Sequence, residues 1–270
     1  MKNKIISILA LQFLIIDVSA QTKWSETKKG EFNIVKNPSG QTLGYSPNSG
    51  VKILTVNGLA FKDLNKNNQL DKFEDWRLPY DLRAKDLASK LSIKEITGLM
   101  LYSSHQSIPA RPGGYFAGTY NGKPFKAGET DPSDLTDQQK KFLAEDNLRH
   151  VLVTTVQTPE IAAKWNNKLQ AFCESVGFGI PANNSTDPRH GTRAKAEYDA
   201  ASGGEISMWP NSLGMAATFD PSLTQKFGEI AAKEYRALGI TTALSPQVDI
   251  ATEPRWARFN GTFGESPLLS

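Results

Sequence analysis

The chain has 270 residues, of which 39% are hydrophobic and 22% are charged, and its formal net charge is +3. This balance is typical of a globular protein with a sizeable core, and it excludes a disordered chain or a coiled coil. Because the basic residues are scattered, nothing favours nucleic acid or an anionic membrane surface as a partner, and we expect neutral partners.

Residues 1–20 have the pattern of a secretory signal. Two lysines precede an apolar stretch, and residues 18–20 are small enough for signal peptidase. The alternative is a membrane anchor, but the apolar run is shorter than the ~20 residues needed to span, and Asp17 interrupts its end. We therefore expect an exported protein, periplasmic or extracellular, with no membrane insertion after cleavage. Cys173 is the only cysteine, so no internal disulfide forms.

Residues 21–80 form a predicted N-terminal extension. Within it, GEFNIVKNPSGQTLGYS (30–46) alternates apolar and polar residues around a Pro-Ser-Gly turn, which predicts a hairpin. From residue 81 the leucines and isoleucines follow helical spacing, and LMLYSS (99–104) then predicts a short buried strand. Residues 106–140, rich in Gly, Pro, Asp and Lys, predict a long loop.

Strands and helices alternate in the remainder, residues 81–270. VLVTTV (151–156) predicts a buried strand, and Thr158 and Pro159 can cap and open a helix that ends near Gly177. The apolar run before Pro181 predicts the next buried strand.

The same design repeats further along the chain. Asp220 caps and Pro221 opens a second helix that Gly239 closes, and ITTALSPQVDI (240–250) follows as a strand. Repeated βα units predict an α/β fold with a parallel sheet, either a (β/α) barrel or a doubly wound sheet.

Charged residues gather where two of these strands end. Asp187, His190 and Arg193 follow one strand, and ATEPRWAR (251–258) follows the next. Chemistry in α/β folds collects at the carboxyl ends of strands. The residues leave two alternatives open, a binding site or a structural network of ion pairs.

Several common catalytic motifs are absent from the sequence. It has no GxGxxG after a strand, no Walker A loop, no GxSxG and no HExxH, so nucleotide binding, serine hydrolysis and zincin chemistry lose their usual support. The three histidines lack metal-ligand spacing, and we expect His105 and His150 to be surface or capping residues. Cys173 falls on the buried helix face, where packing is its expected role.

The stretch DLNKNNQLDKFE (63–74) has the spacing of a calcium-binding loop. The predicted ligands are Asp63, Asn65, Asn67, Gln69, Asp71 and Glu74. Asn68 stands where glycine normally makes the sharp turn, and asparagine best tolerates that left-handed conformation among the other residues. The alternative is an Asn-rich turn without metal. We expect a structural Ca²⁺ and no cofactor required for the chemistry.

Three ordered segments resemble glycoside hydrolase family 3 enzymes of the β-glucosidase type. They are STDPRHGTR, the stretch from WPNSLG to RALGI, and ALSPQVDIATEPRWARFNGTFGESPLL, and the resemblance covers roughly residues 82–270. The family pattern Asp-x-x-His-Gly is matched in full after one strand. Its Asp-Pro-Arg-Trp-Gly-Arg pattern is matched with two departures, Glu253 for Asp and Ala257 for Gly.

The resemblance implies a (β/α)8 barrel whose rim holds one terminal sugar. Asp187 would accept hydrogen bonds from sugar hydroxyls and Arg258 would donate to neighbouring ones, with His190, Arg193 and Arg255 in support. An Asp rather than a Glu at the position of Asp187 indicates glucose. The expected function is retaining, exo-acting hydrolysis of terminal non-reducing β-D-glucosyl residues.

The resemblance also leaves a part of the chemistry unassigned. The family's nucleophile and acid/base cannot be found in these residues, and about half of an eight-stranded barrel is recognisable. We therefore expect a fragment of a longer enzyme that by itself releases no glucose. The alternative is a noncatalytic secreted protein that binds carbohydrate or has a structural role.

Overall fold

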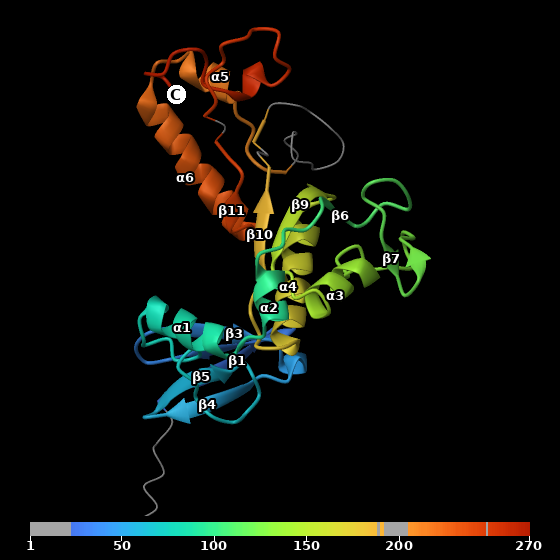
Figure 1. Ribbon diagram of the computed structural model, residues 1–270, viewed down its shortest axis with the longest axis vertical. Coiled ribbons are helices and arrows are strands. Elements are labelled where there is room, and N and C mark those ends of the chain that lie inside the picture. Colours follow the sequence, from blue (N-terminus) through green and yellow to red (C-terminus); the bar gives the residue numbers. More distant parts are fainter. Residues whose placement is uncertain (1–22, 188–189, 192–204, 247) are drawn as a thin grey trace, which may run out of the picture.

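The computed structural model describes residues 23–187, 190–191, 205–246 and 248–270. Figure 1 shows an elongated molecule in which the N-terminal strands form one block and the parallel sheet with its helices forms another. The predicted signal and Arg193 lie outside the described residues. None of the helices within the described ranges is long and apolar enough to cross a membrane.

The N-terminal block is antiparallel. Its strands are β1 (Ser25–Lys29), β2 (Phe32–Lys36), β3 (Thr42–Tyr45), β4 (Lys52–Val56) and β5 (Leu59–Asp63), with the 3-10 turn η1 (Pro47–Ser49) between β3 and β4. The first three form a sheet in the order β1-β2-β3, and β4 pairs with β5. The β2–β3 pairing confirms the predicted hairpin. Val35, Leu43 and Ala60 form the small core of this block.

A four-stranded parallel sheet forms the second block. In spatial order its strands are β11 (Thr242–Ala243), β10 (Asn183–Thr186), β9 (His150–Val156) and β6 (Gln106–Ile108). The four strands follow one another across the sheet in chain order, with β7 and β8 between β6 and β9 in the chain, and every pairing is parallel, which confirms the predicted α/β class. Because four strands do not close into a barrel, the complete barrel stays a prediction.

Helices and short elements complete the fold. They are α1 (Tyr80–Lys90), α2 (Ile93–Leu99), β7 (Thr119–Tyr120), β8 (Lys123–Pro124), α3 (Asp137–Ala144), α4 (Pro159–Ser175), α5 (Ser212–Ala216), α6 (Pro221–Ala237) and η2 (Phe259–Gly261). Trp165 and Leu169 of α4 pack with Val151 in the main core, and Tyr235 of α6 belongs to the same cluster. The burial of these apolar faces holds both helices on the sheet.

The structure confirms the predicted helix starts and the packing role of the cysteine. The Thr158 hydroxyl accepts from the Ile161 amide, and the Asp220 carboxylate caps α6 in the same way. Cys173 is fully buried in the main core, and this burial raises the pKa of its thiol to about 11. A thiol with this pKa stays protonated at neutral pH.

Three predicted elements are wrong. LMLYSS is not a regular strand, because α2 runs to Leu99 and the rest of the stretch pairs with β9 only through an isolated parallel bridge between Tyr102 and His150. Residues 106–140 are not one loop, since they contain β6, β7, β8 and the start of α3. The strand expected before Pro181 lies after it, as β10, and consists of the polar residues NNST.

Candidate active site

Asp187 and Arg258 arise from the same edge of the parallel sheet. Asp187 directly follows the last residue of β10, and the chain after β11 reaches Arg258 just before η2. Since β10 and β11 are parallel, both segments leave at the carboxyl edge, where α/β folds place their chemistry. Asp187 is half-buried and Arg258 is exposed. The prediction that Asp187 lies at a strand end is therefore confirmed, and the roles of Asp187 and Arg258 stay predictions.

β10 presents polar side chains on both faces. Asn184 reaches α4, where its amide nitrogen donates to Asn166 Oδ1 at 2.8 Å. Asn183 points to the other face, with its amide nitrogen 3.2 Å from His150 Nδ1 on β9. Side chains alternate along a strand, so Asp187 continues the face of Asn183 and Ser185. This face lies opposite α4.

His190 anchors the segment that carries Asp187 to helix α6. Its Nε2 atom lies 2.7 Å from Glu234 Oε2, and because a carboxylate only accepts, the imidazole is the donor. Glu234 also accepts from the Ser207 hydroxyl at 2.8 Å. The His190 ring is buried and packs edge-on against Tyr235, with ring centres 4.8 Å apart. His190 therefore fixes its own loop on α6, and its role in support of a sugar site stays a prediction.

The motif after β11 contains an ion pair. Arg255 donates to Glu253 through Nε at 2.8 Å and through Nη2 at 2.9 Å. These hydrogen bonds lower the pKa of Glu253 to about 2. Both side chains are exposed, so the pair fixes the turn locally and adds little to stability. The structure therefore shows an ion pair in this loop, and sugar binding by the loop stays a prediction.

His105 lies at the sheet, contrary to the prediction of a surface or capping role. Its Nδ1 atom is 2.6 Å from Thr154 Oγ1 on β9. The ring also packs against Tyr115 and Phe116, with centres 5.7 and 6.4 Å away. The sequence has no signal for this contact, because His105, Tyr115 and Phe116 lie in a segment without hydrophobic periodicity.

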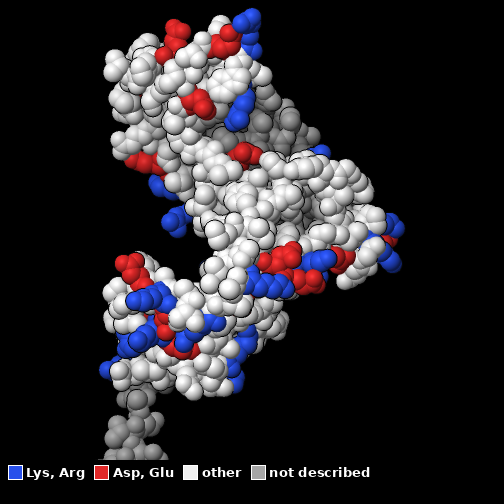
Figure 2. Space-filling model, viewed as in Figure 1, with Lys and Arg blue, Asp and Glu red and all other residues white. Residues whose placement is uncertain are grey.

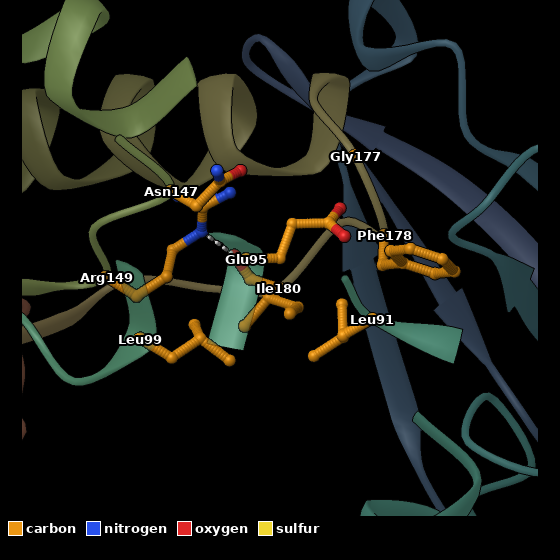
Figure 3. Close-up of a pocket in the computed structure, with 8 residues that line it drawn as sticks. All are labelled: Leu91, Glu95, Leu99, Asn147, Arg149, Gly177, Phe178 and Ile180. Atoms are coloured by element: carbon orange, nitrogen blue, oxygen red, sulfur yellow. Dashed lines mark hydrogen bonds between the residues drawn. The ribbon is translucent and has the colours of Figure 1, made fainter. Parts of the chain in front are cut away.

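A small cavity in the described residues lies away from the carboxyl edge of the sheet. A cavity of about 10 Å³, enough for one water, lies between Glu95, Arg149 and Ile180, and Figure 3 shows the residues that line it. Arg149 Nε donates to the Ile180 carbonyl at 2.8 Å, and burial lowers the pKa of this guanidinium. A wider groove of about 670 Å³ runs past Phe32 and Phe172. Arg149 and Ile180 precede β9 and β10, so the cavity lies at the amino edge, away from Asp187.

The predicted calcium loop begins at the end of β5. Buried Asp63 accepts hydrogen bonds from the backbone amides of Asn67 and Asn68, at 3.0 and 2.9 Å. Asn68 has a φ of 60°, in the left-handed region. Asparagine therefore makes the turn that glycine normally makes in such loops, as the sequence predicts.

The other loop carboxylates are also engaged within the loop. Glu74 accepts from the amides of Leu64 and Asp71, at 2.7 and 3.0 Å, and burial raises its pKa. Asp71 accepts from the Asn65 side chain at 2.7 Å and pairs with Lys90. In the described ranges, no group of three or more His, Cys, Asp or Glu side chains is placed to hold a metal ion. The calcium site therefore stays a prediction.

Charged side chains are unevenly distributed on the visible surface. In Figure 2, charges of both signs lie over the N-terminal block and in a band beside it, while most of the remaining visible surface is uncharged. A mixed and sparse distribution of this kind does not make an electrostatic footprint for nucleic acid.

Comparisons with known proteins identify the family of the chain. The family model "Glycosyl hydrolase family 3 N terminal domain" matches residues 125–270. The chain is 41% identical over 223 residues to a periplasmic beta-glucosidase/beta-xylosidase of Dickeya chrysanthemi, covering 82% of this chain and 31% of that protein. It is 34% identical over 217 residues to beta-glucosidase C of Emericella nidulans, covering 79% of this chain and 32% of that protein.

A solved structure is also similar. The glycoside hydrolase family 3 beta-N-acetylglucosaminidase from Paenibacillus sp. str. FPU-7 aligns with a TM-score of 0.46 and 20% identity, covering 66% of this chain and 28% of that one. The chain spans about a third of the length of the two relatives from Dickeya and Emericella. Since the family model covers more than half of its residues, the chain belongs to glycoside hydrolase family 3 and carries sequence of that family's N-terminal domain.

Proposed function

We propose that the protein is a β-glucosidase that removes terminal non-reducing β-D-glucosyl residues by a retaining mechanism. The observation that carries this proposal is the position of Asp187, at the carboxyl end of β10 and on the polar face of the sheet. Family membership and the names of the relatives, beta-glucosidases and a beta-glucosidase/beta-xylosidase, support it.

Asp187 and Arg258 have the chemistry needed to hold a neutral sugar. An ionised carboxylate accepts from two neighbouring hydroxyls, and a planar guanidinium donates to two more. Charge-assisted hydrogen bonds of this kind are about twice as strong as neutral ones. His190 keeps the Asp187 segment on α6. Retaining hydrolysis also needs a nucleophile and an acid/base, and we assign neither role to a residue described here.

The proposal includes the organisation and location of the protein. We propose that residues 1–20 are a signal, that residues 21–80 form an extension, and that residues 81–270 begin a (β/α)8 barrel. The Dickeya relative is named periplasmic, which supports export. Since the nucleophile and acid/base are unassigned, we propose that residues 1–270 alone release no glucose.

The decisive experiment replaces Asp187 with alanine in the complete protein. Losing its charge-assisted hydrogen bonds should lower kcat/KM for an aryl β-glucoside ~30- to 1000-fold, or about 2 to 4 kcal/mol, with the melting temperature nearly unchanged. Glu129→Ala is the matched control, because Glu129 is an exposed carboxylate paired only locally with Lys126. Wild-type turnover in Asp187→Ala would refute the assignment. Parallel assays with an aryl β-xyloside decide the sugar.

We also propose that the loop of residues 63–74 binds a structural Ca²⁺. The side chains of Asn65, Asn67 and Asp71 converge, with both amide nitrogens within 2.8 Å of Asp71 Oδ2. Rotating the amides would present oxygens, the ligands that Ca²⁺ prefers. The loop contacts the barrel part directly, since Lys66 Nζ donates to the Glu174 carbonyl at the end of α4 at 3.1 Å. Binding should therefore stabilise the junction between the two blocks.

A further inference from the structure

A groove of about 670 Å³ lies between the N-terminal block and helix α4. One wall consists of the β1–β2 turn and η1, and the other consists of the start of α3 and the last turns of α4. Because α4 follows β9 and precedes β10, its last turns lie at the amino edge of the sheet (Figure 1). The helix has 17 residues and is about 25 Å long. The groove is therefore separate from the carboxyl edge that carries Asp187.

Hydrogen bonds from a buried carboxylate fix the two walls of this groove to each other. Glu174 on α4 is buried and accepts from Lys62 Nζ on β5 at 2.6 Å and from the Ser46 amide beside η1 at 3.0 Å. Lys66 Nζ donates to the Glu174 carbonyl at 3.1 Å. The groove is thus formed before any ligand arrives, and a preformed site loses little free energy to reorganisation on binding.

Two phenylalanine rings line the groove, one from each wall. Phe172 on α4 is half-buried and packs against the main core. Phe32 on β2 is also half-buried, but among the described residues it does not belong to the cluster around Val35 that forms the N-terminal core. A ring in this position offers an apolar face to a ligand. Apolar rings with a few polar groups are typical of ligand sites, whose volumes are about 300 to 1,000 Å³.

The charges of the side chains around the groove nearly cancel. Lys168 is paired with Asp134 at 2.7 Å and with a second carboxylate at the same distance. Lys28, Glu31 and Lys140 also line the groove, are exposed, and have no ion-pair partner in the part of the chain that the structure describes. Amines donate to hydroxyls and carboxylates accept from them, whereas a site for an anion needs a clear excess of cations. The lining therefore fits a neutral polyol.

We propose that this groove is a second carbohydrate site, which holds an internal segment of a neutral polysaccharide and takes no part in hydrolysis. Phe32 and Phe172 stack on sugar rings, and Lys28, Glu31 and Lys140 bond to hydroxyls. Because the groove runs along the junction of the two blocks, it accepts the middle of a chain. Binding there keeps the protein on the polymer while the carboxyl edge stays free. The inference does not depend on how the residues at that edge are assigned.

The test is affinity electrophoresis of the complete protein. Native gels contain increasing amounts of hydroxyethylcellulose, a neutral glucan polymer with so few chain ends that an exo-acting active site contributes little to binding. Retardation of the wild-type protein gives a Kd, and Phe32→Ala should raise this Kd about tenfold. Phe32→Tyr keeps a ring and should retain most of the affinity. Tyr80→Ala, which removes an exposed aromatic side chain on α1, is the control and should leave the Kd unchanged.

A second variant tests the opposite wall. Lys140→Ala removes an exposed side chain of α3, and it should raise the Kd about threefold without disturbing the fold. No retardation of the wild-type protein, or wild-type retardation of both Phe32→Ala and Lys140→Ala, would overturn the inference. Tighter binding to the anionic polymer carboxymethylcellulose that disappears in high salt would also overturn it, because charge alone would then explain binding.

The outcomes separate this inference from the proposed function. Asp187→Ala should be retarded as strongly as the wild-type protein, and loss of its retardation would locate binding at the carboxyl edge and overturn the inference. A protein that is retarded by hydroxyethylcellulose but never hydrolyses an aryl β-glucoside would refute the proposed function and support this site.

Discussion

The Glu234 carboxylate on α6 should be required to hold the Asp187 segment in place. In the structure it accepts from His190 Nε2 at 2.7 Å, from the Ser207 hydroxyl at 2.8 Å and from the Ser207 amide. Glu234→Ala removes this acceptor from a histidine whose side chain is only 2% exposed. The variant therefore tests whether a helix contact behind the sheet controls a residue at its edge.

The expected magnitude follows from the cost of unmet buried donors, about 1 to 3 kcal/mol. The Glu234 side chain is 28% exposed, so water can reach part of the vacated space, and we take the lower half of the range, about 1 to 2 kcal/mol. For a domain of this size, about 1 kcal/mol shifts the melting temperature by about 2 to 4 °C. Glu234→Ala should therefore lower Tm by about 2 to 8 °C.

Thermal unfolding followed by circular dichroism measures this loss, and kcat/KM for an aryl β-glucoside in the complete protein measures its effect on the site. We expect kcat/KM to fall about tenfold, equivalent to about 1.4 kcal/mol. Glu234→Gln keeps one acceptor oxygen for His190 and should lose about half as much stability. Glu229→Ala on the same helix, where the side chain accepts only from Gln225, is the control. Wild-type Tm and kcat/KM in Glu234→Ala would refute the reasoning.

Three further predictions concern stability and reactivity. Because burial raises the thiol pKa to about 11, Cys173 should react with a disulfide reagent at pH 8 only after unfolding, and rapid labelling of the native protein would contradict its burial. Millimolar Ca²⁺ should raise Tm, and Glu74→Gln should abolish the gain; an unchanged Tm with excess chelator would leave only an Asn-rich turn. Gly98→Ala should cost about 1 to 3 kcal/mol, since its Cβ would lie 2.1 Å from the Asp146 carbonyl oxygen, whereas Gly228→Ala, with open space around it, should be neutral or stabilising by up to about 1 kcal/mol in the same melts.

Short sequence features determined where the main helices begin, and ordered motifs determined the family. Thr158-Pro159 and Asp220-Pro221 satisfy the first backbone amides of α4 and α6 from within a few residues, so their starts are readable from the sequence. The left-handed turn at Asn68 is local in the same sense. The three segments that resemble the family follow one another along the chain as they do in the family. The position of Asp187 at a strand end could therefore be predicted.

Only the tertiary structure decided β10 and the surroundings of the site. Its NNST sequence looks like a loop, and it forms a buried strand because its partners come from afar: Asn184 donates to Asn166 on α4 and to the Gly239 carbonyl. The apolar LMLYSS stretch was predicted as a strand from its composition, but α2 takes up its first residue and its pairing with β9 is limited to an isolated bridge between Tyr102 and His150. Glu234, 44 residues from His190, has no sequence signal at all. Side chains whose hydrogen-bond partners lie far away in the sequence leave no local pattern. Their burial depends on the assembled sheet.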